Sequence, residues 1–128
     1  LRRALNLGHT VGHAFESMAM SRKQPIPHGY AVAWGAIVEL ILSHMQLGFP
    51  SDTLRRYTDF VYHNYGVFHI TCDDYPMLIE LMRHDKKSNS GEMNFSLLAD
   101  VGDIKINCEA NEDDVKAALD IYRDLVHI

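Results

Sequence analysis

The sequence predicts a mainly α-helical domain, a helical bundle with one small β-hairpin. Apolar residues recur at helical spacing through most of the chain, and apolar–polar alternation is confined to about residues 93–106. No glycine-rich turn follows a strand, so these residues do not contain a dinucleotide-binding fold. The length of 128 residues suits a single domain of this kind.

The first helix is expected over residues 4–20. Its apolar stripe consists of Ala4, Leu5, Val11, Ala14, Phe15 and Met18. Gly8 and Gly12 are poor helix formers, each costing about 1 kcal/mol relative to alanine. Because they lie four residues apart, they form a smooth trough that something must approach closely. Either another helix or a ligand could fill it.

A loop with two prolines is expected over residues 21–27, followed by a helix from about 30 to 47. That helix is apolar nearly all round, which predicts a position at the centre of the bundle. Gly48 and Pro50 are expected to end it.

Three later helices are expected over residues 51–66, 72–87 and 111–126. Each follows a residue able to accept a hydrogen bond from the first turn: Ser51 or Asp52, Asp73 or Asp74, and Asn111. In the last helix, four apolar residues are expected to face inward: Val115, Leu119, Tyr122 and Val126. Between the last two helices, alternating residues predict a hairpin with its turn at 99–103.

Composition restricts the possible partners. A hydrophobic fraction of 47% and a charged fraction of 23% are usual for a globular domain. The net charge of −5 argues against nucleic acid or an anionic membrane as a partner. The sequence contains no run of about 18 apolar residues, so we expect no transmembrane helix. Cys72 and Cys108 show no CxxC spacing, as expected for reduced cytoplasmic thiols, although the sequence leaves a disulfide between them open.

Three of the eight histidines stand out by their spacing. His9 and His13 share one helix face, and the proline loop could fold His28 back over that face. Imidazoles so placed can bind one divalent ion, or one can bind metal while another transfers protons. The alternative is that they are packed helix histidines without function. The other five show no metal-binding spacing: His44, His63, His69, His84 and His127.

Three segments, in order, resemble a known family. They are "LRRALNLGHTVGHAFE", "IPHGYAVAWG" and "HDKKSNSGEMNFSLLADVGD". Together they resemble the C-terminal domain of 3-dehydroquinate synthase, over about residues 1–105. The resemblance implies that residues 1–128 form the C-terminal helical domain of a two-domain enzyme whose N-terminal, NAD-binding domain is absent. Tyr30 departs from the pattern, because the family commonly has glutamate there.

The resemblance also implies individual roles. His9 and His28 would bind the catalytic metal, zinc or cobalt, and His13 would contact the substrate phosphate and take part in proton transfer. Four further residues would bind substrate, with Lys87 favoured over its neighbour: Arg2, Asn6, Lys86 and Lys87. The third metal ligand, a glutamate, and the NAD site would belong to the other domain.

The activity implied is that of a lyase in the shikimate pathway of aromatic amino-acid biosynthesis. Such an enzyme converts 3-deoxy-arabino-heptulosonate 7-phosphate to 3-dehydroquinate and phosphate, using bound NAD and a metal ion. We expect a cytoplasmic homodimer when the enzyme is complete, and no activity from this piece alone. Three alternatives stay open: another sugar-phosphate cyclase, the metal domain of an iron-type polyol or alcohol dehydrogenase, and a non-catalytic helical interaction module.

Overall fold

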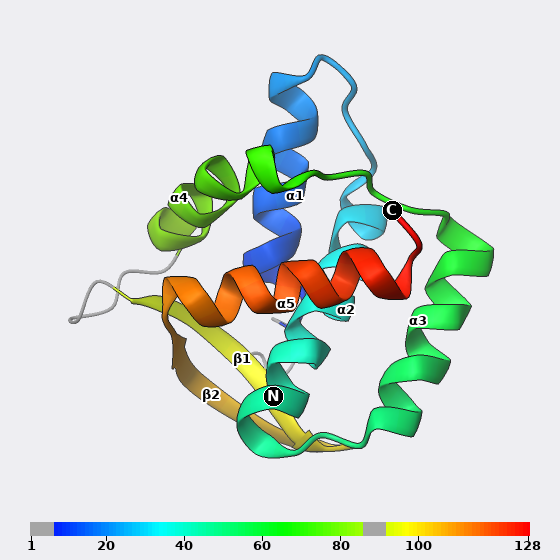
Figure 1. The fold of residues 1–128 in the computed structure, drawn as a ribbon, viewed down its shortest axis with the longest axis vertical. Coiled ribbons are helices and arrows are strands. Elements are labelled where there is room, and N and C mark those ends of the chain that lie inside the picture. The colour runs from blue at the N-terminus through cyan, green and yellow to red at the C-terminus, as the bar shows by residue number, and fades with distance from the viewer. Residues whose placement is uncertain (1–6, 86–91) are drawn as a thin grey trace.

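A computed structural model describes residues 7–85 and 92–128. The elements, in chain order, are α1 (His9–Ser21), α2 (His28–Leu47), α3 (Ser51–Tyr65), the 3-10 turn η2 (Cys72–Asp74), α4 (Tyr75–Asp85), β1 (Met93–Asp100), β2 (Asp103–Ala110) and α5 (Glu112–Leu125). The helices pack together, and the two-stranded antiparallel hairpin lies at one side of them (Figure 1). The predicted fold class, mainly helical with one small hairpin, is confirmed.

Helix α2 is the central element of the bundle. It packs against α1, α3, α5 and β1, as Figure 1 shows. By length and composition alone α2 could also cross a membrane, contrary to the expectation from the sequence. However, 61% of that stretch is buried inside the fold. Its apolar character is therefore accounted for by its place in the core.

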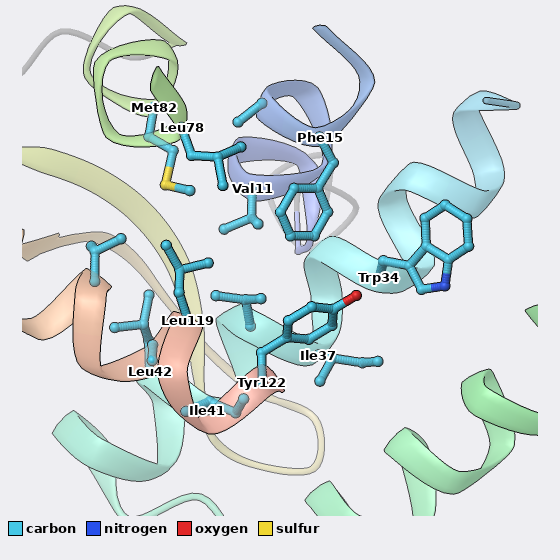
Figure 2. Close-up of a cluster of buried hydrophobic side chains, with 14 of the residues drawn as sticks. Val11, Phe15, Trp34, Ile37, Ile41, Leu42, Leu78, Met82, Leu119 and Tyr122 are labelled. Atoms are coloured by element: carbon cyan, nitrogen blue, oxygen red, sulfur yellow. The ribbon is translucent and has the colours of Figure 1, made fainter. Parts of the chain in front are cut away.

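The core gathers apolar side chains from four helices (Figure 2). Phe15 from α1 packs against Tyr122 from α5, with ring centroids 5.8 Å apart. The phenol of Tyr122 donates a hydrogen bond to the Phe68 carbonyl at 2.8 Å, which satisfies its one buried polar group. The four residues expected to face inward on the last helix are all buried, as predicted: Val115, Leu119, Tyr122 and Val126.

The glycine trough of α1 is filled by α2 and not by a ligand. A Cβ on Gly12 would lie 3.1 Å from the Ala31 carbonyl oxygen, and one on Gly8 would lie 2.7 Å from that of Val32. On the opposite helix, a Cβ on Gly35 would collide with the backbone of Gly8 and Gly12. Glycine on both sides therefore lets the two backbones touch.

The first helix is expected from residue 4, but α1 begins at His9, because the left-handed Gly8 precedes it; residues 4–6 lie outside the described part of the chain. Three further helix starts differ from prediction. Helix α2 begins at His28, directly after the extended Pro27, and not near residue 30. Helix α3 has Pro50 as its N-cap with no side-chain cap, because the fixed φ of proline already sets the entry to the first turn. At the third, Thr71 and Asp74 form a reciprocal capping box ahead of α4. The N-cap is therefore Thr71, and the predicted Asp74 is the second member of the box.

Other local predictions hold. The Asn111 side chain accepts from the Asp114 N–H at 2.8 Å and caps α5, and the left-handed Gly48 ends α2. In the hairpin, Met93 pairs with Ala110 and Asp100 with Asp103, with two register shifts between. The thiols of Cys72 and Cys108 are free, so the disulfide that the sequence left open is not formed.

Candidate functional site

Three imidazole rings meet where the start of α1 lies against the start of α2. The centroids of His9 and His13 are 5.6 Å apart, those of His9 and His28 are 5.6 Å apart, and those of His13 and His28 are 5.9 Å apart. His13 and His28 are exposed and His9 is half-buried. The structure thus brings together all three histidines that the sequence singled out, on an open edge of the bundle.

The close contact of the two helices produces this cluster. Gly12 lies against Ala31 and Val32, one turn after His28. On α1, the histidines that flank Gly12 are therefore held beside the first turn of α2. The left-handed Gly8 (φ 83°) turns the backbone into α1 immediately before His9. A side chain at the glycine positions would push the helices, and with them the rings, apart.

Each ring uses its Nδ1 atom to contact an oxygen. Nδ1 of His13 lies 2.7 Å from Oδ1 of Asp85, the last residue of α4. Nδ1 of His28 lies 2.9 Å from Oε1 of Glu16. Nδ1 of His9 lies 3.3 Å from the Leu7 carbonyl oxygen. Because these oxygens are acceptors, Nδ1 carries the proton and Nε2 of each ring keeps a lone pair when the imidazole is neutral.

This arrangement has the chemistry of imidazole donors prepared for a metal ion. Metal-binding histidines commonly donate their other N–H to a carboxylate or carbonyl, which fixes the ring and its tautomer. Two imidazoles on one tetrahedral zinc, with Zn–N bonds of about 2.1 Å, have centroids roughly 5 Å apart. The three observed separations are close to that value. Within residues 7–85 and 92–128, however, no three His, Cys, Asp or Glu side chains are arranged to hold a metal ion on their own.

Four of the predicted substrate-binding residues lie outside the described part of the chain: Arg2, Asn6, Lys86 and Lys87. Their roles stay predictions. Lys86 follows Asp85 directly in the sequence, and Asp85 ends α4 in contact with His13.

Sequence reasoning missed three carboxylates that hold the cluster together. Asp85 and Glu16 contact the rings of His13 and His28. Glu39, from the middle of α2, is fully buried and accepts the N–H groups of Gly8 and Val11 at 2.8 and 2.9 Å. For Glu39 a signal existed, since it is the one charged residue inside an apolar helix. A buried charge of that kind must have partners.

Among the described residues, no ring contact joins any of the other five histidines to the cluster. Nδ1 of His44 contacts the Phe49 carbonyl at 2.7 Å, and Nε2 of His84 contacts Glu80 on an exposed face of α4. Two surface hollows also lie elsewhere. One is lined by Arg55 and Asp124 among others, and the second by Arg22 and Trp34 among others. Neither hollow includes a ring of the cluster.

Fold and site together define a helical domain that presents oriented imidazoles on one edge, the donor type found in metal and phosphate sites of enzymes. The sequence profile described as "3-dehydroquinate synthase C-terminal" matches residues 1–88. The chain therefore belongs to the 3-dehydroquinate synthase family.

Individual relatives agree with this assignment. A 3-dehydroquinate synthase of Parabacteroides distasonis is 45% identical over 124 residues, which is 97% of this chain and 35% of that protein. Those of Clostridium tetani and Thermococcus kodakarensis are 35% and 34% identical, over 93% and 97% of this chain and 31% and 34% of their own lengths. The chain thus spans about a third of the length of these curated relatives.

Proposed function

We propose that this chain supplies the metal-binding and phosphate-binding half of the active site of a 3-dehydroquinate synthase. The complete enzyme would convert 3-deoxy-arabino-heptulosonate 7-phosphate to 3-dehydroquinate and phosphate. The observation that carries the proposal is the cluster of His9, His13 and His28, with all three Nδ1 atoms engaged by oxygens. The family assignment favours this activity over an iron-type dehydrogenase or an interaction module.

In this proposal His9 and His28 hold the catalytic metal, zinc or cobalt, through Nε2. The bound ion supplies Lewis-acid chemistry, which lowers the pKa of a coordinated substrate hydroxyl. A third ligand from the amino-terminal domain of the same polypeptide would complete the site, consistent with the lack of a self-sufficient set of three among the described residues. That domain would also bind NAD, which supplies the reversible oxidation of one hydroxyl.

The other residues would bind and orient the substrate. His13 lies one turn after His9, with ring centroids 5.6 Å apart. Imidazole is the side chain that most often transfers protons in enzymes, and His13 would take this role. Asn6 and either Lys86 or Lys87 would donate to the phosphate group, which needs cationic and polar donors. Arg2 would hold further polar groups of the substrate. A homodimer in the cytoplasm is part of the proposal, and the free thiols of Cys72 and Cys108 are consistent with that compartment.

The test is phosphate release by the complete enzyme that carries this chain. Release from the heptulosonate phosphate should require NAD, should stop after chelation, and should return with added zinc or cobalt. His9→Ala should abolish it, whereas His44→Ala, at a histidine outside the cluster, should not. Turnover that survives complete metal removal would reject the metal assignment. Failure with this substrate but turnover of another sugar phosphate would indicate a different cyclase.

A further inference from the structure

We propose that Asp85 is a positioning residue for His13: it holds the Nδ1–H of that ring and thereby leaves the Nε2 lone pair facing the substrate side of the site. This inference rests on the proposed function, because it names the residue that prepares the proposed proton-transfer group. Asp85, the last residue of α4, contacts His13 in the second turn of α1.

The contact differs from an ordinary surface ion pair. The Oδ1–Nδ1 distance is 2.7 Å, and the partners are 72 residues apart in sequence. The Asp85 side chain is 17% exposed, whereas that of His13 is 45% exposed. The acceptor is thus the more enclosed member, and the ring it holds remains open to a ligand.

A surface pair on the same helix provides the comparison. His84 and Glu80 are also in contact, at 2.8 Å, but their side chains are 73% and 61% exposed and belong to neighbouring turns of α4. That pair joins nothing to the site. Exposed pairs of this kind contribute about 0–1 kcal/mol and impose little order on their side chains.

The contact with Asp85 determines which ring nitrogen of His13 carries the proton. A carboxylate can only accept, so Nδ1 of His13 must be the protonated nitrogen. In the neutral ring Nε2 is then the base. Within residues 7–85 and 92–128 no other hydrogen bond or ion pair holds the His13 ring. The Nε2 atom is therefore available to a substrate, beside the rings of His9 and His28.

The substitution that tests this is Asp85→Asn. The amide has nearly the same shape, but its NH₂ group can donate to an unprotonated Nδ1, so both tautomers of His13 become possible. In the complete enzyme we expect kcat to fall about tenfold or more, with KM changed less than about threefold, because a misoriented base slows proton transfer more than it weakens binding. Asp85→Glu keeps the acceptor and should recover part of kcat. Glu80→Gln, the matched control on the same helix, should retain the wild-type kcat.

A spectroscopic readout separates positioning from general support of the fold. Two-bond ¹H–¹⁵N correlation spectra of the ¹⁵N-histidine-labelled 128-residue chain, at a pH where His13 is neutral, report which nitrogen carries the proton. His13 should show the Nδ1–H form in the wild-type and Glu80→Gln chains, and a gain of the Nε2–H form in Asp85→Asn. Its signals are identified by their loss in His13→Gln.

The outcomes are distinct. A wild-type kcat for Asp85→Asn, or an unchanged His13 tautomer, overturns the proposal. Equal losses in Asp85→Asn and Asp85→Glu, with the tautomer unchanged, also overturn it and assign Asp85 to the fold alone. If the wild-type enzyme releases no phosphate, the proposed function fails, and the nitrogen shifts alone decide whether Asp85 sets the tautomer of His13.

Discussion

Glu39 and Gly8 are joined by a hydrogen bond of 2.8 Å, from the Gly8 N–H to Oε1 of a carboxylate that is fully buried. The second carboxylate oxygen accepts the N–H of Val11 at 2.9 Å. The donors are the N-cap residue Gly8 and Val11, the third residue of α1, and backbone N–H groups at these positions lack intrahelical partners. Glu39 thus caps α1 from inside α2, because the N-cap residue Gly8 has no side chain to do so. The same contact holds the backbone of His9, which lies between the two donors, in place against α2.

Glu39→Gln should therefore destabilise the fold. The amide keeps one acceptor but turns an NH₂ group toward a backbone N–H, and it removes the negative charge at the positive end of the helix. We expect a loss of about 1–3 kcal/mol in the free energy of unfolding, the cost of leaving a buried donor unsatisfied. Denaturant unfolding followed by circular dichroism measures this.

The matched control is Glu80→Gln, at the exposed pair with His84. Its effect should stay within about 0.5 kcal/mol, as for most surface substitutions. If both variants unfold at the same denaturant concentration, Glu39 does not cap α1 as the structure indicates.

Gly35→Ala should separate α1 from α2. The added Cβ would collide with the backbone of Gly12 and Gly8, which cannot move without shifting the whole helix. We expect a destabilisation of roughly 1–3 kcal/mol from overpacking. Gly29→Ala is the control in the first turn of α2, where a Cβ meets nothing within 4 Å. It should be neutral or stabilising by up to about 1 kcal/mol, since alanine is the better helix former. Equal stability of both variants would contradict the proposed close contact.

Patterns local to one element predicted most of the fold. The all-round apolarity of residues 30–47 indicated a central helix, and that helix is the centre of the bundle. Asn111 carried its own capping signal, and its side chain makes the expected bond. The paired glycines showed that something approaches α1 closely, but its identity depended on Gly35, which is remote in sequence. A single-element pattern cannot specify such a partner.

In the site, too, local patterns predicted some features, whereas others depend on residues remote in sequence. Spacing placed His9 and His13 on one face, and the convergence of His28 could be proposed from the loop that precedes it. The carboxylates that orient the rings are not determined by any local pattern. Asp85, 72 positions after His13 in the sequence, reaches its ring only because α4 ends beside α1. Taken by itself, an aspartate before two lysines is typical of an ordinary helix end, and no spacing pattern links Asp85 to His13.

Ionisation of the Tyr57 phenol should destabilise the fold at alkaline pH. Burial, with a smaller contribution from Tyr65, raises the pKa of Tyr57 from 10.0 to about 12. The folded protein therefore keeps the phenol proton while the unfolded chain loses it near pH 10. The stability from the neutral phenol is complete below pH 10 and is lost as pH rises to about 12, amounting to at most about 3 kcal/mol. Between pH 9 and 12, the free energy of unfolding should fall less steeply with pH for Tyr57→Phe than for the wild-type protein. An unchanged slope would contradict the assignment.

Metal binding should depend on His9 and His28 together. In the complete enzyme, His9→Ala and His28→Ala should each lower zinc affinity at least tenfold, because each removes one of the proposed imidazole ligands. His44→Ala removes an imidazole outside the cluster and should leave the affinity unchanged. Competition with a chromophoric chelator measures these affinities. The 128-residue chain alone should bind zinc weakly, since two imidazoles are fewer than the usual three protein ligands of a catalytic zinc. Tight one-to-one binding by the chain in calorimetry would show that its own residues complete the site, and that no ligand from another domain is needed.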